Sequence, residues 1–112
     1  MKIEKDIFER LYAITDSISV IDESLQGLGF GEYYNDRKKM ILVVRQFETI
    51  ISSVKALPEE FKAKYPEIDW EEIENLGNSF IHYESGVDEE KVWGAAKHKL
   101  HRLYKFITKL LQ

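Results

Sequence analysis

His82 is the residue whose type and position could most readily do chemistry in this chain of 112 residues. It stands at the expected end of a helix, beside a glycine-containing turn, with Asn78 before it and Tyr83 directly after it. A neutral imidazole can take a proton from a nucleophile or give one to a leaving group. RNA carries an internal nucleophile in its 2′-hydroxyl, so a histidine and a donor that stabilises phosphate could suffice to cleave it without a metal ion. Residue types alone favour a simpler role, in which His82 caps the end of its helix.

Other familiar catalytic arrangements are missing from the sequence. His98 and His101 are three residues apart and could in principle share a metal ion, but the chain has no cysteine and no Glu-x-x-His pattern to complete such a site. The run Gly27-x-Gly29-x-Gly31 follows a helical segment and lacks the Lys-Ser/Thr pair of a phosphate-binding loop. We therefore expect no metal site and no cofactor.

Charge is distributed unevenly along the chain. The formal net charge is −4, which gives no global attraction to nucleic acid. Residues 59–90 carry 11 acidic and 2 basic side chains, whereas residues 91–112 carry 6 basic and no acidic ones. Lys97, Lys99 and Arg102 in the basic segment could therefore offer a local surface to an RNA backbone. The alternative is that the two segments are solvated faces of adjacent helices that complement each other.

Hydrophobic spacing predicts two long helices in the first half of the chain. Apolar residues recur at intervals of 4-3-4-3-4 from Ile7 to Leu25, which places them on one stripe of a helix. The glycines at positions 27, 29 and 31 are expected to end this helix and reverse the chain through backbone conformations with positive φ. Asp36 is the expected N-cap of the second helix, and Pro58 is expected either to end this helix or to open the next short one. The expected stripe of the second helix is Met40, Val44, Phe47, Ile51 and Val54, widened by Ile41, Val43 and Ile50.

The second half predicts shorter elements. A helix of at most two turns fits residues 59–64, and Asp69 begins the next helix with a capping-box-like pattern. Residues 83–87 are expected to form a short turn, after which Asp88 caps a last helix that continues to Leu110. No segment shows sustained period-two alternation, so no strand is expected.

These elements predict a single all-α domain over residues 1–112, an up-and-down bundle of four to five helices. The broad apolar stripe of the second helix fits either a core helix or a helix-packed homodimer. The longest apolar run, at residues 40–44, is far too short to span a bilayer, and no secretory signal is visible at the N-terminus. The expected location is the cytoplasm, with no membrane association.

A set of ordered motifs resembles a known family. The run Tyr65-Pro66-Glu67-Ile68-Asp69-Trp70 is followed by His82, by Gly86-Val87-Asp88 and by Val92-Trp93. In this order and spacing they resemble the HepT-like (DUF86) family of the HEPN superfamily, over roughly residues 34–111. The resemblance implies an all-α bundle that forms a homodimer.

The resemblance also implies a function. HepT-like proteins are commonly toxins encoded beside a minimal nucleotidyltransferase antitoxin, and the toxin is a metal-independent ribonuclease with Arg, His and Tyr in a cleft between two protomers. His82 matches the motif histidine, and Asn78 matches the polar residue that follows the arginine. Gly77 occupies the arginine position and Glu84 the tyrosine position, with Tyr83 displaced by one residue.

Two hypotheses therefore come out of the sequence. In the first, the protein is a ribonuclease toxin that uses His82 with the help of Tyr83 and Asn78. In the second, it is a catalytically inactive member that binds a nucleotidyltransferase or acts as a regulatory interaction module. Loss of a guanidinium and gain of a carboxylate beside an approaching phosphate both oppose catalysis, so the second hypothesis stays open.

Overall fold

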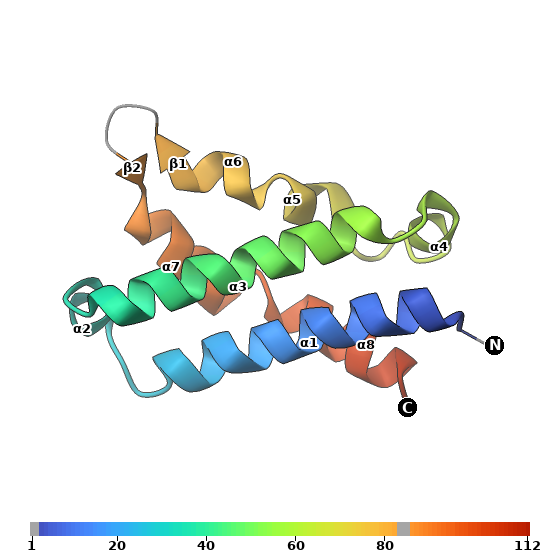
Figure 1. Cartoon of the computed structure of the whole chain (residues 1–112), viewed down its shortest axis with the longest axis horizontal. Helices are drawn as coiled ribbons and strands as arrows, with labels where there is room; N and C mark the ends of the chain where they lie inside the picture. Colours follow the sequence, from blue (N-terminus) through green and yellow to red (C-terminus); the bar gives the residue numbers. More distant parts are fainter. Residues whose placement is uncertain (1–2, 83–85) are drawn as a thin grey trace.

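The computed structural model describes residues 3–82 and 86–112, and helices dominate this part of the chain. The two longest helices, α1 (Lys5–Leu25) and α3 (Arg37–Ala56), run antiparallel and side by side (Figure 1). The remaining helices pack around this pair, so the predicted all-α bundle is confirmed. Within the described residues, no helix combines the length and apolar character needed to cross a membrane.

The seam between α1 and α3 forms the core. The predicted stripe of α1 is confirmed from Leu11 onward, since Leu11, Ile14, Ile18, Ile21 and Leu25 are all buried, whereas Ile7 is only half-buried. On α3 the buried line is rotated relative to the prediction and consists of Val43, Phe47, Ile50 and Val54. Met40, Val44 and Ile51 are only half-buried, and Ile41 is exposed. The apolar stripe of α3 therefore packs into the core along one side and is exposed to solvent along the other.

The connection between α1 and α3 differs from the expected glycine turn. Gly27 alone of the three glycines has a positive φ, at 77°, while Gly29 is extended and Gly31 lies inside a short helix, α2 (Phe30–Tyr34). The backbone N–H of Gly29 donates to Glu32 Oε1 at 3.1 Å and so satisfies a donor at the start of α2. The expectation for Gly29 and Gly31 was wrong because this side-chain cap favours a helical turn where glycines alone suggested a loop.

The three predicted aspartate N-caps are confirmed. Asp36 accepts from the backbone N–H of Lys39 at the start of α3, at 3.2 Å. Asp69 accepts from Glu72 N at 3.0 Å at the start of α5 (Trp70–Glu74). Asp88 accepts from Lys91 N at 3.2 Å at the start of α7 (Glu89–His98). Each carboxylate satisfies a backbone donor that has no partner within its helix.

Two helices that the sequence predicts as continuous are interrupted. A turn at Asn75 separates α5 from α6 (Leu76–Phe80), and Lys99 and Leu100 separate α7 from α8 (His101–Leu110). The second break redirects the chain, so α7 packs on α2, α3 and α6 while α8 packs on α1. Leu100 is buried at the break, which keeps the helical spacing of apolar residues intact and hides the interruption from the sequence. The short α4 (Glu59–Ala63) follows Pro58 as expected.

A short β-hairpin joins α6 to α7. Strand β1 (Ile81–His82) pairs antiparallel with β2 (Gly86–Val87), with Ile81 opposite Val87 and His82 opposite Gly86. The expectation of no strand was wrong here, because two residues per strand are too few to show period-two alternation. Gly86 adopts φ of 84°, a conformation that favours glycine.

Lys62 on α4 links α4 to α3 and α5 near the end of α3. Its Nζ lies 2.7 Å from Glu74 Oε1 on α5 and 3.1 Å from Glu59 Oε1, and it donates to the carbonyl of Val54 at 3.4 Å. Only 5% of the lysine is exposed. Burial alone lowers the pKa of Lys62, but its hydrogen bonds and ion pairs with the two glutamates outweigh burial, so the net pKa is raised. The charged lysine is therefore a stabilising part of the fold.

We expect Lys62→Met to lower the free energy of unfolding by about 1–3 kcal/mol at pH 7, because the Val54 carbonyl and Glu74 lose a charged donor. A raised pKa means that the contribution of the ammonium is present below the usual value of 10.5 and is lost as the pH rises above it. The difference between wild type and variant should therefore shrink in urea denaturation at pH 11. Lys64→Met, at an exposed neighbouring position, is the control. Equal losses in the two variants would contradict the assigned role.

Candidate functional site

Two of the predicted catalytic residues, Asn78 and His82, lie where α6 passes into the hairpin, at the end of the molecule that also holds α2 (Figure 1). Asn78 is exposed on α6, and its Nδ2 donates to Asn75 Oδ1 at 3.5 Å. His82 follows in β1, with its backbone opposite Gly86. Tyr83 and Glu84 lie outside the described residues. The structure thus places Asn78 and His82 in consecutive elements of one connection.

The base of the hairpin is fixed to the core on both sides. Phe80, the last residue of α6, is buried, and its ring meets Phe47 of α3 edge-on at 5.0 Å between centroids. The backbone N–H of Asp88 donates to the carbonyl of Phe80, and Asp88 also caps α7. His82 therefore lies two residues beyond a buried anchor, on a strand whose return is held at Asp88.

Gly77 lies on α6 without a backbone need for glycine. Its φ is not positive, and a Cβ built there would meet Ile51 Cδ1 at 3.6 Å, an ordinary van der Waals contact. The position is half-buried. A side chain that leads out to solvent can therefore be accommodated at this position of α6.

An open pocket of about 450 Å³ lies between α3 and the corner where β2 meets α7. Its apolar lining consists of Met40, Ile41, Val44 and Val87. Its charged lining consists of Arg37, Arg45, Glu48 and Glu89. Within residues 3–82 and 86–112, neither guanidinium of this pocket forms an ion pair. The four charged residues were not predicted from the sequence as part of a site, although the four-residue spacing of Arg37, Ile41 and Arg45 places them on one face of a helix.

Glu89 in this pocket is held by a buried tyrosine. The hydroxyl of Tyr33 on α2 donates a short hydrogen bond to Glu89 Oε1. Burial of the phenol, followed by the hydrogen bond and the charge of Glu89, raises the pKa of Tyr33, so the phenol stays protonated as a donor. The contact fixes the first turn of α7 against α2.

Of the three basic residues predicted to bind RNA, Lys99 and Arg102 line one pocket, whereas Lys97 contacts an aromatic ring. Lys97 Nζ stands 4.7 Å from the centroid of the Trp93 ring, a cation–π contact. Lys99 Nζ forms an ion pair with Glu72 Oε1 at 2.9 Å. Arg102 and Lys99 line a second pocket, of about 270 Å³, together with Glu67, Asp69 and Glu72. The pairing of Lys99 favours the alternative in which the acidic and basic segments complement each other.

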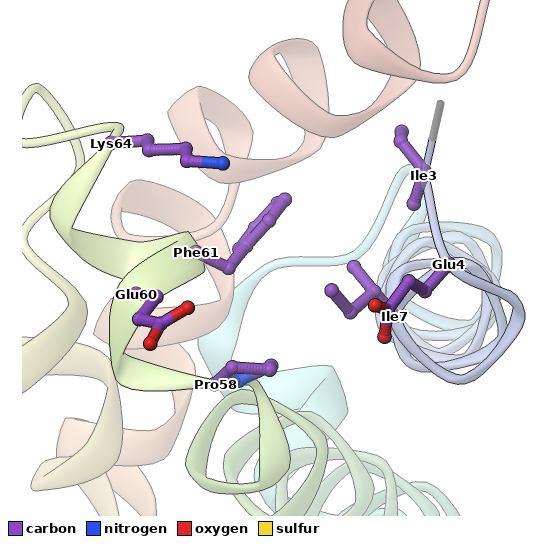
Figure 2. Close-up of a pocket in the computed structure, with 7 residues that line it drawn as sticks. All are labelled: Ile3, Glu4, Ile7, Pro58, Glu60, Phe61 and Lys64. Atoms are coloured by element: carbon purple, nitrogen blue, oxygen red, sulfur yellow. The ribbon is translucent and has the colours of Figure 1, made fainter. Parts of the chain in front are cut away.

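The remaining candidates are a metal site and a further pocket near the N-terminal end of α1. In the described part of the chain, no three histidine or acidic side chains are grouped so that they could hold a metal ion. A pocket of about 230 Å³ lies at the opposite end of the molecule, between α4 and the start of α1. Figure 2 shows Phe61 projecting from α4 toward Ile3 and Ile7, so this pocket is a packing gap between the two helices.

Comparison with known proteins gives a consistent family. A family model described as "Ribonuclease HepT-like" matches residues 14–110. A protein of Methanocaldococcus jannaschii named "Putative RNase MJ0127" is 30% identical over 109 residues, which cover 97% of this chain and 90% of the relative. "Probable ribonuclease HepT" of Thermococcus cleftensis is 31% identical over 90 residues, covering 80% of this chain and 82% of the relative. No solved structure gives a significant match. Since the family model covers most of the chain, from α1 to the end of α8, the chain belongs to the ribonuclease HepT-like family.

Proposed function

We propose that the protein is a cytoplasmic, metal-independent endoribonuclease that acts as the toxin of a toxin–antitoxin pair. The observation that carries this proposal is the family match over residues 14–110, a range that contains His82 and the hairpin on which it lies. The named relatives are described as ribonucleases, which supports the same activity here. The fixed base of the hairpin supports it further, because a catalytic group needs a held backbone.

The proposed reaction uses the internal nucleophile of RNA. The 2′-hydroxyl loses its proton and attacks the adjacent phosphorus, which forms a 2′,3′-cyclic phosphate. The bond from phosphorus to the 5′-oxygen breaks, and that oxygen takes up a proton. His82 is proposed to carry one of these protons, with Asn78 and Tyr83 assisting as hydrogen-bond donors.

The alternative is a catalytically inactive protein that works by binding. Gly77 favours it, because the resemblance places an arginine at this position and glycine supplies no donor to a phosphate. Such a protein would hold a nucleotidyltransferase or compete with an active toxin.

Two protein partners belong to the proposal. A minimal nucleotidyltransferase is the expected antitoxin under either hypothesis. A second copy of the chain is expected as well, and exposed apolar side chains on the two strands of the hairpin support such a contact. Ile81 is 61% exposed and lies opposite Val87, which is 41% exposed.

The first test measures cleavage of single-stranded RNA in EDTA. We expect His82→Ala to lower the cleavage rate about 100-fold or more, since general acid–base catalysis contributes this much. His98→Ala, at an exposed histidine of α7, is the matched control and should cleave like wild type. Equal cleavage by wild type and His82→Ala would rule out the role of His82, and an inactive wild type would favour the binding alternative.

The second test restores a guanidinium at Gly77. We expect Gly77→Arg to cleave RNA at least about tenfold faster than Gly77→Ala, because an arginine donor can stabilise the charged phosphate. Both variants remove a helical glycine and should gain up to about 1 kcal/mol of stability, so the alanine variant separates this gain from the chemistry. Cleavage rates and urea denaturation are measured in parallel. If the arginine variant is no faster, the glycine does not limit catalysis.

A further inference from the structure

We infer that the pocket between α3 and the β2–α7 corner binds single-stranded RNA, with Arg37 and Arg45 holding its phosphates. The inference rests on the proposed function, since it names the RNA-binding surface of that activity. This surface lies at the exposed edge of α3 and is separate from the predicted RNA-binding residues Lys97, Lys99 and Arg102.

The shape of the pocket suits a nucleotide chain. Arg37 and Arg45 are eight residues apart, which is about 12 Å along the axis of a helix. Between them lie Met40, Ile41 and Val44, which give the pocket an apolar floor. Ile41 is 44% exposed, so the floor is open to a ligand. The apolar faces of bases can be buried against such a floor while the phosphates contact the cations at its two ends.

The two arginines of the pocket are suited to a phosphate ligand. A guanidinium presents a planar fork of donors that matches phosphate oxygens. Among the described residues, Arg37 and Arg45 have no carboxylate partner to compete with such a ligand. Of the two acidic groups in the lining, Glu89 accepts the hydrogen bond from Tyr33. Glu89 keeps its negative charge when it accepts this bond, so Glu48 and Glu89 both oppose an anion and the binding of phosphate depends on the two arginines.

The pocket adjoins the element that carries His82. Val87 lines the pocket, and its chain neighbour Gly86 pairs with His82 across the hairpin. Paired residues of antiparallel strands have Cα atoms about 4.5–5.5 Å apart. A chain of RNA seated on α3 therefore lies beside the hairpin. This adjacency favours RNA over a peptide as the occupant.

The test is a binding measurement that does not depend on cleavage. A fluorescently labelled single strand of 2′-O-methyl RNA, which lacks the 2′-hydroxyl nucleophile, is titrated with the full chain and followed by anisotropy. We expect Arg37→Gln and Arg45→Gln each to weaken binding about tenfold and to reduce the salt dependence. Glu48→Gln should strengthen binding. Arg10→Gln, an exposed arginine on α1, is the matched control and should bind like wild type.

The outcomes separate this inference from the proposed function. Wild type that does not bind the RNA, or arginine variants that bind it like wild type, would overturn the inference even if unmodified RNA is cleaved. Binding that depends on the arginines in a protein that cleaves no RNA supports the inference and removes the proposed activity. The oligomeric state of each variant is measured by light scattering, and a loss of binding only where the state changes would assign this face to contact between copies instead.

Discussion

The antiparallel seam between α1 and α3 is the constraint on which the rest of the structure depends. Side chains such as Ile14, Ile18, Phe47 and Ile50 are removed from water along it, and burial of one such side chain contributes about 1.5–3 kcal/mol. The shorter helices have five to ten residues, too few to be stable alone in water, so they need this surface to form. The candidate site depends on the same seam, because Phe47 is also the residue on which Phe80 packs.

Much of the fold could be predicted from the sequence because burial and capping leave local signals. The stripe of α1 and the N-caps Asp36, Asp69 and Asp88 were all predicted correctly. The break at Leu100 could not be predicted, since Leu100 fits the apolar spacing of one continuous helix and is buried as that spacing requires. The reason for the break is tertiary: α8 must turn to cover α1, while α7 stays against α2 and α3. Periodicity reports which face is apolar but not whether the axis bends.

The candidate site, like the fold, could be predicted only in part from the sequence. The ordered motifs locate His82 and the family, because their spacing along the chain is itself the signal. The basic surface is harder to predict, since charge counts along the sequence average over faces that point in different directions. Residues 1–58 carry 8 basic and 9 acidic groups, a net charge of −1, yet Arg37 and Arg45 both line one pocket. Conversely, Lys97 and Lys99 are close in sequence but contact Trp93 and Glu72 respectively.

The first turn of α7 couples the parts of the site to each other. Asp88 closes the hairpin through the carbonyl of Phe80 and caps α7, while the next residue, Glu89, binds Tyr33 and lines the pocket on α3. Two adjacent residues therefore fix the strand that carries His82, the helix that follows it and the wall that faces Arg37 and Arg45. A shift of this turn would move the hairpin and the pocket together. The relative placement of His82 and the arginines is thus set by backbone hydrogen bonds and one buried phenol, which explains how such short elements can hold a site at the edge of a small bundle.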